Sequence, residues 1–357
     1  MSVLIWLAVF VLLSLAAGAS YQVLGTKRDQ KNYPPPGWLV DLGTHRLHIL
    51  ESGNANGPTV VFESGLMSTV LSWTEIADRL SPSYRIVRYD RAGLGWSDLG
   101  PMPRTADQIA SELHALLDKA AIPPPYVLVG HSFAGLTMPV FAARFPSEVA
   151  GMLLLDPVAP SEWSPPSGRD QKLVSIGATV CRRAAFITRF GLLRLVRFLL
   201  TTRAKSLASR LVRLISRGAP EDSGTVSSPW FSALPTLEKE MAGIFWIQPK
   251  FALTIASQLE NLPCSADCAQ SQKVFSEKPV IILSAASASQ ARRNAHAEVA
   301  ALLPRAVHVV AERSGHWIMK DEPELVVRAI ESVNKGDLTV FHLAKVTQIN
   351  ETGTPTG

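Results

Sequence analysis

The 357-residue sequence predicts an α/β fold, namely a doubly wound, mostly parallel sheet with a helical cap insertion and an N-terminal transmembrane helix. Short apolar runs alternate with helical patterns along most of the chain, which is typical of a parallel sheet covered on both faces. Between residues 161 and 278 helical patterns dominate and strand patterns are missing, which indicates the insertion. No charged residue occurs from Ser2 to Thr26, which indicates the membrane helix.

The apolar N-terminal segment, residues 1–26, is predicted to anchor the chain in a membrane. As a helix, the 25 residues from Ser2 to Thr26 would rise about 1.5 Å each and cross a hydrocarbon core of about 30 Å. A removable secretion signal is the alternative, because the small residues at positions 17–19 resemble a cleavage site. The retained anchor is favoured, since no Lys or Arg precedes the apolar run and basic residues follow it. A single span leaves the side of the membrane open.

A polar segment and a hairpin follow the anchor. Residues 27–37 are proline-rich and are predicted to form a semi-rigid spacer. The stretch "WLVDLGTHRLHILESG" alternates apolar and polar residues on both sides of Gly43, which is typical of a β-hairpin. This hairpin is expected to begin the first part of the core, residues 38–160.

Six further apolar runs predict the remaining strands. Four lie in the first part of the core and two in its second part, residues 279–335. These runs are Thr59–Glu63, Arg85–Tyr89, Tyr126–Gly130, Met152–Leu155, Val280–Ala285 and Ala306–Ala311. The cap, residues 161–278, divides the two parts. Residues 336–357 form a thinly apolar tail that is predicted to be disordered.

The stretch "TADQIASELHALLDKAA" shows the helical pattern between strands most clearly. Ile109, Leu113, Leu116 and Leu117 fall on one face of the predicted helix. Thr105 is a suitable N-cap, because its hydroxyl can accept a hydrogen bond from the first turn.

Charge and cysteine content restrict the functions to be considered. The formal net charge of +5 is modest, and no RNA-binding signature or basic-aromatic stripe occurs, so nucleic acid is not expected as a partner. Cys264 and Cys268 are expected to be ordinary small buried side chains, with a small disulfide in an oxidising compartment as the alternative. No histidine lies near them, so no metal site is expected. The oligomeric state is left open.

The stretch "YVLVGHSFAGLTMPVFAARFP" places a serine on an abrupt turn from a strand into a helix. This is the context of a nucleophile elbow, in which the serine has unusual backbone angles and its neighbours must be small. Gly130, Ala134 and Gly135 meet that need, with an alanine where a glycine is usual. The hydroxyl of Ser132 would then stand at the carboxyl end of the sheet and at a helix N-terminus. A chance match in a buried turn is the alternative for so short a motif.

Two further stretches predict the partners that a serine nucleophile needs. In "VVFESGLMSTVLSW" a strand runs into a glycine-containing loop, and the N–H of Leu66 would form an oxyanion hole with the N–H of Phe133. In "VVAERSGHWIMKDEPELV" His316 follows the last predicted strand, where its imidazole would take the proton of Ser132. A base is required because free serine is a poor nucleophile at neutral pH.

The acid of such a triad is expected between Ser132 and His316 in the chain. Its usual position is empty, because no carboxylate occurs between Leu283, in the penultimate strand, and Glu298. Asp156 closes the strand after the nucleophile's helix and is expected to reach His316 from that strand end, with a local capping role as the alternative. The remaining candidates are Glu298 and then Glu277 and Asp267.

With these residues the chain resembles the α/β-hydrolase superfamily, and within it the membrane-anchored alpha/beta fold hydrolases. The matching pieces are "PPPGWLVDLGTHRLHILESG", "PTVVFESGLMSTVLSW", "IVRYDRAGLGWSD", "PYVLVGHSFAGL", "VAGMLLLDP" and "SGHWIMKDEPELV". The resemblance implies a hydrolase without metal or organic cofactor, with Ser132 as nucleophile, His316 as base, and Leu66 and Phe133 as oxyanion donors. It supplies no acid, and it implies a structural role for the turn "YDRAGLGWSD". Epoxide hydrolases and dehalogenases of this fold carry Asp at the elbow, so Ser132 argues against those reactions.

The sequence therefore predicts a membrane-tethered hydrolase that cleaves a carboxylic ester of a small apolar or lipid-like substrate through an acyl-enzyme on Ser132. A non-catalytic binding module with the same fold is one alternative, because the usual acid is missing. Hydrolysis of an amide, a thioester or a carbon–carbon bond is another, because it uses the same triad. Ten Lys or Arg residues and no Asp or Glu lie between Cys181 and Arg217 in the cap, which favours a solvated helix or a contact with anionic membrane lipid.

Overall fold

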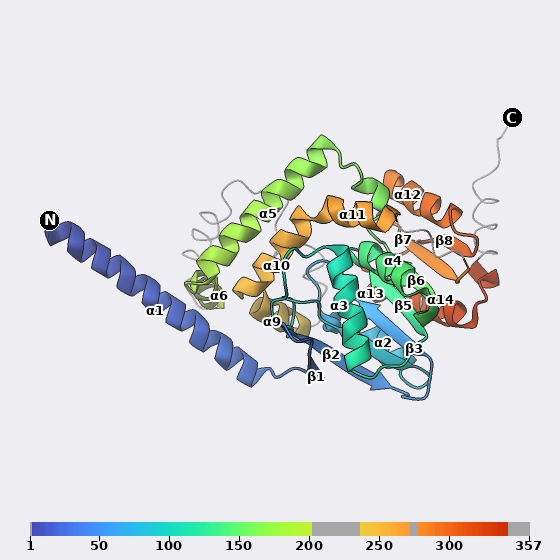
Figure 1. Cartoon of the computed structure of the whole chain (residues 1–357), viewed down its shortest axis with the longest axis horizontal. Coiled ribbons are helices and arrows are strands. Elements are labelled where there is room, and N and C mark those ends of the chain that lie inside the picture. Colours follow the sequence, from blue (N-terminus) through green and yellow to red (C-terminus); the bar gives the residue numbers. More distant parts are fainter. Residues whose placement is uncertain (1, 202–235, 272–276, 342–357) are drawn as a thin grey trace.

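The computed structural model describes residues 2–201, 236–271 and 277–341 (Figure 1). Its centre is an eight-stranded sheet with the strand order β1-β2-β4-β3-β5-β6-β7-β8. β2 is antiparallel to β1 and to β4, and all the other pairings are parallel. The strands are β1 (Trp38–Asp41), β2 (Arg46–Gly53), β3 (Thr59–Glu63), β4 (Arg85–Tyr89), β5 (Tyr126–His131), β6 (Val149–Leu155), β7 (Val280–Ala285) and β8 (Ala306–Ala311). The predicted α/β fold with a mostly parallel sheet is confirmed.

The strand bounds follow the apolar runs closely. β3, β4, β7 and β8 begin and end where the sequence predicts, and β5 is longer by His131. β6 begins earlier than predicted, at Val149, because Val149 pairs with Tyr126 of the parallel neighbour β5. The hairpin turns at Gly43, which has a φ of 96° that favours glycine and whose N–H donates to Asp41 Oδ1 at 2.7 Å.

Helices cover both faces of the sheet, so that each strand contributes to two cores. Tyr126 and Leu128 of β5 face one core, and Val127 and Val129 between them face the other. The first core is covered by α3 (Ala106–Lys119), α4 (Ala134–Arg144) and α12 (Gln290–Ala301). The second is covered by α2 (Thr74–Leu80), α13 (Ile318–Asp321) and α14 (Pro323–Lys335).

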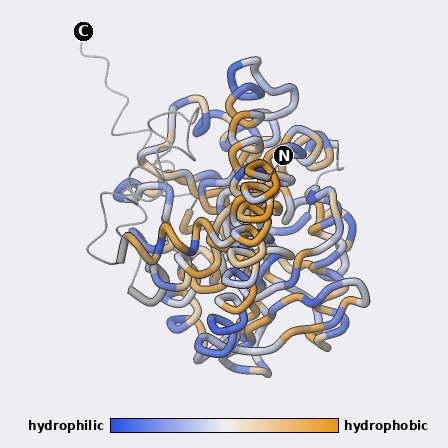
Figure 2. Tube along the Cα trace, turned by 90° about the vertical axis from the view of Figure 1, so that its left-hand side faces the viewer, coloured by the Kyte–Doolittle hydropathy of each residue, from blue (hydrophilic) through white to orange (hydrophobic). Residues whose placement is uncertain are grey.

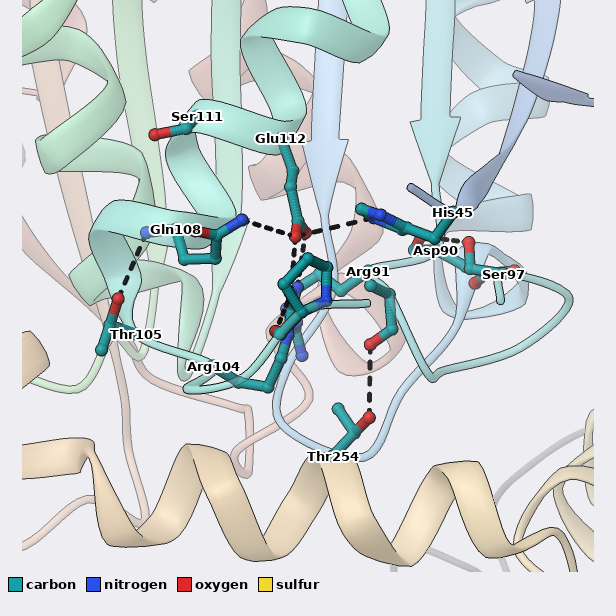
Figure 3. Close-up of polar contacts among 12 residues, drawn as sticks. His45, Asp90, Arg91, Ser97, Arg104, Thr105, Gln108, Ser111, Glu112 and Thr254 are labelled. Carbon is teal, nitrogen blue, oxygen red and sulfur yellow. Dashed lines mark hydrogen bonds and ion pairs between the residues drawn. The ribbon is translucent and has the colours of Figure 1, made fainter. Parts of the chain in front are cut away.

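Helix α3 combines the predicted N-cap with a buried ion pair. The Thr105 hydroxyl accepts from the N–H of Gln108 at 3.2 Å. Glu112, on the same helix, accepts from Arg104 through both carboxylate oxygens, at 2.6 and 2.5 Å, and both side chains are almost fully buried. Figure 3 shows Glu112 between Arg104, Gln108 and His45. Because a buried charge needs its partner, this pair fixes the segment that leads from β4 into α3.

The described part of the predicted cap is helical. It contains η3 (Pro160–Glu162), α5 (Gly168–Thr188), α6 (Leu192–Thr201), α9 (Thr236–Phe245), α10 (Pro249–Glu260) and α11 (Leu262–Ser271). α5 packs along α10 (Figure 1). Cys264 and Cys268 lie on α11 and are not linked to each other. Of the basic stretch between Cys181 and Arg217, residues 202–217 lie outside the described residues.

The cap is held on the core at the turn after β4, the stretch "YDRAGLGWSD". The buried ammonium of Lys250 on α10 donates to the carbonyl oxygens of Gly95 at 2.9 Å and Ser97 at 2.7 Å. The N–H of Arg104 donates to the hydroxyl of Ser257, also on α10, at 2.9 Å. This turn therefore has the structural role that the resemblance implies, because α10 of the cap binds to it.

The N-terminal helix α1 (Ser2–Asn32) is, among the described residues, the one helix that is long and apolar enough to cross a membrane. It continues beyond the predicted end of the anchor at residue 26 and includes most of the predicted spacer. The reason is packing against the cap. Gln22 donates through Nε2 to the carbonyl oxygen of Ile247 at 3.0 Å, and Asp29 forms an ion pair with Arg194 of α6 at 2.8 Å.

The first residues of the predicted disordered tail fold onto the core. Leu338 and Phe341 are buried and belong to the same core cluster as α14. Residues 342–357 lie outside the described residues. The prediction of a disordered tail is therefore wrong for residues 337–341, because two apolar side chains anchor this segment.

Candidate active site

Ser132 sits on a sharp turn between β5 and α4 with a left-handed backbone, at a φ of 56°. Its N–H donates to the carbonyl oxygen of Leu155 on the neighbouring strand at 3.0 Å, which holds the turn against the sheet. The turn is tightly packed: a Cβ on Gly130 would lie 2.9 Å from that of Ala134, and a Cβ on Gly135 would lie 2.4 Å from Pro157. Larger side chains at Gly130 and Gly135 would therefore clash with their neighbours, which explains why small residues surround the serine.

His316 and Asp156 meet at the same edge of the sheet. Asp156 follows β6, and His316 lies in the loop between β8 and α13. Nδ1 of His316 donates to Oδ2 of Asp156 at 2.6 Å. Asp156 is 2% exposed, and its Oδ1 accepts from the N–H of Ala285 at 3.2 Å. The strand end after β6 thus brings a carboxylate to the imidazole, as the sequence predicts.

The environment of Asp156 favours its charged form. Burial raises the pKa of a carboxyl group, but the hydrogen bond and the charge of His316 oppose this, so the pKa of Asp156 lies below its ordinary value. A carboxylate accepts the Nδ1 proton and leaves Nε2 of His316 as the unprotonated nitrogen of the neutral ring. The site therefore presents the tautomer that a general base requires.

The hydroxyl of Ser132 and the imidazole of His316 lie on adjacent loops. The ring of His131, the residue before the serine, lies 4.5 Å from the ring of His316, measured between centroids. Oγ of Ser132 makes no hydrogen bond with any residue that the structure describes. Hydrogen bonds between a nucleophile and its base are often long without substrate and tighten in the reactive complex.

The loop after β3 approaches the elbow from the other side. A Cβ on Gly65 would lie 3.3 Å from Cβ of Ser132, so Gly65 allows this close approach. The N–H groups of Leu66 and Phe133 donate to no backbone or side-chain acceptor within the described ranges. Both of the predicted oxyanion donors therefore lie beside the serine without a protein partner.

Arg91, for which the sequence analysis predicts no catalytic role, holds this loop through hydrogen bonds to its carbonyl oxygens. Its guanidinium is buried and donates to the carbonyl oxygens of Ser64, Gly65 and Leu66, with 2.6 Å to Gly65 and 3.3 Å to Leu66. It also forms an ion pair with buried Glu63 at 3.1 Å. Donating to the loop carbonyls turns their peptide groups so that the N–H groups point the other way. The position of Arg91 two residues after the end of β4, at the carboxyl edge of the sheet, was the available signal.

His131 is the second residue that the sequence reasoning missed. Its Nε2–H donates to the carbonyl oxygen of His316 at 2.8 Å and so holds the loop that carries the imidazole. The side chain is buried, and Nδ1 has no partner among the described residues. Burial, together with the neighbouring His316, lowers the pKa of His131 to about 3. His131 is therefore neutral at every pH at which the protein is expected to act.

This buried histidine predicts how stability depends on pH. The unfolded chain binds a proton at His131 near the ordinary pKa of 6.5, whereas the folded chain binds it only near pH 3. Between these values the unfolded state holds more protons, so the free energy of unfolding falls as the pH falls, by about 1.4 kcal/mol per pH unit. We expect His131→Gln, whose amide keeps the donor to His316, to flatten this slope in urea unfolding of the full chain between about pH 6 and about pH 4. Equal slopes for the two proteins would contradict this origin, since the other histidines are common to both.

The other predicted acids lie away from the imidazole. Glu298 is an exposed residue in the second half of α12. Asp267 on α11 accepts a hydrogen bond from the hydroxyl of Ser164, and Glu277 is exposed before β7. Of the four candidates, Asp156 is the one that the structure joins to His316.

An apolar wall borders the loop after β3, which carries the predicted oxyanion donor Leu66 and is called the oxyanion loop below. Leu66 and Met67 of the loop pack against a buried cluster that contains Leu94 and Phe251, and Cys181 of α5 packs against the same cluster. In the described ranges, no three His, Cys, Asp or Glu side chains cluster in a way that would hold a metal ion. The elbow thus has the imidazole of His316 and the two N–H groups nearby, and the apolar wall lies beside the loop that carries Leu66.

Comparison with known proteins places these residues in a family context. A family model described as "Alpha/beta hydrolase family" matches residues 60–329, a range that includes the elbow, Asp156 and His316. A mouse (Mus musculus) protein named "sn-1-specific diacylglycerol lipase ABHD11" is 23% identical over 285 residues, which cover 79% of this chain and 83% of that protein. A solved structure of a thermophilic esterase from Thermogutta terrifontis superposes with a TM-score of 0.55 at 19% identity, over 83% of this chain and 96% of that one. At this identity the likeness shows the fold alone.

A more similar sequence matches a shorter range. A protein of Hormonema carpetanum named "Probable transporter efuK" is 48% identical over 103 residues, which are 28% of this chain and 15% of that protein. The chain spans half or less of the length of the first curated relatives it matches. The similarity to these relatives therefore concerns only the matched range and not the whole length of this chain or of the relatives.

Proposed function

Because the chain belongs to the alpha/beta hydrolase family, we propose that it is a membrane-tethered serine hydrolase that cleaves a carboxylic ester of a small apolar or lipid-like substrate. The observation that carries this proposal is the hydrogen bond from His316 to buried Asp156, at the sheet edge where Ser132 stands on its elbow. If Asp156 only capped its own strand end, it would not need a histidine partner whose Nε2 stays available near a serine. The arrangement instead supports nucleophilic catalysis.

In the proposed mechanism Ser132 attacks the ester carbonyl while Nε2 of His316 takes its proton. The carbonyl oxygen becomes an oxyanion that accepts from the N–H groups of Leu66 and Phe133. Asp156 stabilises the imidazolium that forms and keeps its ring oriented. The tetrahedral intermediate collapses, His316 gives the proton to the leaving alkoxide, and the alcohol departs. His316 then takes a proton from water as the water attacks the acyl-serine, and it returns this proton to Oγ of Ser132 as the acyl bond breaks and the carboxylic acid leaves.

The preorganisation of the oxyanion donors is central to this mechanism. Donors that are fixed before the reaction stabilise the developing charge without reorganisation, which is usually the largest single contribution to catalysis. Arg91 supports the proposal here, because its hydrogen bonds to the loop carbonyls hold the peptide of Leu66 in place. We assign Arg91 a positioning role, since its guanidinium is bonded to the loop and to Glu63.

The apolar wall beside the oxyanion loop supports a substrate whose acyl group is apolar. The wall made by Leu66, Met67, Leu94, Cys181 and Phe251 offers hydrophobic contact and no cation for a charged substrate. The mouse relative is named as a diacylglycerol lipase, which supports a lipid-like ester. The acyl chain would be bound mainly by the removal of its surface from water.

Retention of α1 supports the proposed tether. The predicted cleavage point after Ala19 lies within the helix, next to Gly18, whose Cα is packed against the carbonyl oxygen of Phe190 in the cap. Farther along, Gln22 and Asp29 are bonded to the cap as well. A removable signal has no need of such contacts, so a retained single-pass anchor accounts better for this packing.

The test of the proposed reaction is turnover of a graded series of p-nitrophenyl esters, from acetate to laurate, by the full chain in detergent. We expect hydrolysis, with kcat/KM rising as the acyl chain lengthens, because each buried methylene contributes about 0.8 kcal/mol. The matched p-nitroanilides serve as the control for amide hydrolysis and are expected to react far more slowly. Folded protein that turns over none of the esters between about pH 6 and about pH 9 would overturn the proposal.

A further inference from the structure

The length of α1 outside the cap is too short for a membrane span by itself. Residues 3–17 of α1 are exposed, and at Gly18, the first less exposed position, a Cβ would lie 2.4 Å from the carbonyl oxygen of Phe190. The part before it, Ser2 to Ala17, has 16 residues and measures about 24 Å as a helix, whereas a hydrocarbon core is about 30 Å thick. Figure 2, seen from the side of the N-terminus, shows this part as almost wholly hydrophobic. A spanning α1 therefore carries Gly18 and the following turn, and the cap residues packed on them, to the depth of the bilayer.

The residues that flank Phe190 and Gly191 in the chain include large apolar side chains that are exposed. We define the cap tip as the segment from Phe186 to Phe198, which includes the end of α5 and most of α6. Phe186 is 60% exposed, Leu195 41% and Phe198 57%. Phe186 and Phe190 pack edge to face with 5.4 Å between ring centroids. Large aromatic and aliphatic side chains exposed together beside an apolar helix are typical of a surface that enters the membrane interface.

The cap tip is fixed to α1, so the two move as one surface. Arg194 of α6 forms an ion pair with Asp29 of α1 at 2.8 Å, and both side chains are largely buried. Arg194 also donates to Oε1 of Gln22 at 3.4 Å. The backbone of Gly191 packs against the carbonyl oxygen of Gly18, since a Cβ there would lie 2.9 Å from it. These contacts hold α6 against α1 next to its apolar part.

The charge of the cap tip matches an anionic lipid surface. The sequence from residue 171 to residue 201 contains basic residues and no Asp or Glu. Arg183 on α5 and Arg189 directly after it are exposed, while Arg194 is used in the contact with α1. When aromatic groups insert into a membrane, long basic side chains beside them extend to the headgroup layer. There they attract anionic lipids, by about 1 kcal/mol per charge.

Helix α5 also connects the cap tip to the candidate active site. Cys181 on α5 belongs to the apolar wall beside the oxyanion loop. Phe186, on the same helix, follows Cys181 by five residues, about 7.5 Å along α5. Membrane insertion at the cap tip would thus bring the wall of the site close to the bilayer surface.

We propose that the cap tip is a second, monotopic membrane contact that inserts into the interface of an anionic bilayer next to α1 and opens the site to esters dissolved in the membrane. This proposal rests on the proposed tether by α1 but not on the hydrolytic chemistry. The bilayer is the occupant of the exposed apolar face. Its basic side chains lie at the phosphate level, and its aromatic rings lie below them among the acyl chains.

The test places a photo-cross-linker, p-benzoylphenylalanine, at single positions of the full chain in vesicles of phosphatidylcholine and phosphatidylserine. Phe198 and Phe186 report on the cap tip, and Val11 reports on the span. Leu302, which follows α12 and is 72% exposed, is the matched control for an exposed apolar residue elsewhere. We expect phospholipid adducts at Val11, Phe198 and Phe186, with yields at least about tenfold above that at Leu302.

The outcomes separate this proposal from the others. If Val11 forms adducts but the yields at Phe198 and Phe186 are no higher than the yield at Leu302, the cap-tip contact is overturned and the tether is kept. Adducts at none of the four positions would overturn both. Labelling of the same samples with a fluorophosphonate reports on the serine chemistry independently of either result.

A kinetic experiment with the double variant Phe186→Ser/Phe198→Ser tests the route of the substrate. We expect the rate on a long-chain ester in vesicles to fall about tenfold and the rate on soluble p-nitrophenyl acetate to stay within about twofold of wild type. Leu302→Ser is the matched control and is expected to change neither rate. Equal losses on both substrates, or no loss on the vesicle substrate, would contradict entry from the membrane.

Discussion

Replacing Ser132 by alanine is expected to lower kcat for ester hydrolysis by about 10⁶-fold, because the variant has no nucleophile with which to form the acyl-enzyme. Binding of the ester depends on the apolar wall and the oxyanion loop, so KM is expected to change little. Alanine removes one oxygen atom and keeps the Cβ that lies 3.3 Å from the Cβ position of Gly65, so the elbow retains its packing. The measurement is steady-state turnover of the most reactive p-nitrophenyl ester of the series.

Ser287→Ala is the matched control for this variant. Ser287 lies after β7, and its N–H donates to the carbonyl oxygen of Ser314, two residues before His316. It therefore shares the neighbourhood of the imidazole without a proposed catalytic role, and its variant is expected to keep wild-type turnover within a few fold. Turnover by Ser132→Ala within about tenfold of wild type would exclude Ser132 as the nucleophile.

Asp156→Asn is expected to lower kcat by about 10⁴-fold while the fold is kept. Asparagine can accept through its oxygen from the N–H of Ala285, as Oδ1 of Asp156 does at 3.2 Å. It also tolerates the left-handed backbone of this position, which has a φ of 38°. Its NH₂ group, however, favours a His316 ring whose Nδ1 is an acceptor, so that Nε2 carries the proton and cannot take another from Ser132.

Glu298→Gln provides the comparison that identifies the acid. Glu298 was the second candidate from the sequence and lies exposed on α12, so its variant is expected to match wild-type turnover. Urea unfolding of both variants separates a loss of catalysis from a loss of structure. A large loss in Glu298→Gln with little loss in Asp156→Asn would contradict the proposed triad.

The fold could be predicted from the sequence because its strands are short, buried and regularly spaced. Val60 and Val61 of β3 are both fully buried on opposite faces of the sheet, so apolar residues run without interruption. The same logic predicts the edge at which Ser132, Asp156 and His316 meet, because the carboxyl ends of parallel strands lie together. The structure brings Asp156 and His316 into a hydrogen bond. The catalytic roles of the three residues stay predictions.

Long-range contacts account for what the sequence did not predict. Helix α1 continues beyond residue 26, where Asp29 forms an ion pair with Arg194, a residue far along the chain that local patterns do not report. Arg91 and His131 escaped notice for a similar reason. Arg91 acts on the carbonyls of a loop some 25 residues earlier, and His131 on a carbonyl in the last third of the chain. Local patterns report neighbours in sequence, and these partners are neighbours only in space.

Covalent labelling with a fluorophosphonate probe tests most directly whether Ser132 is an activated nucleophile. The probe reacts with a serine hydroxyl that a base has made nucleophilic, and peptide mass spectrometry locates the adduct. The full wild-type chain is expected to carry one phosphonate on the peptide that contains Ser132, and His316→Ala is expected to carry almost none. Folded wild-type protein that stays unlabelled, or a phosphonate on another serine, would contradict the account.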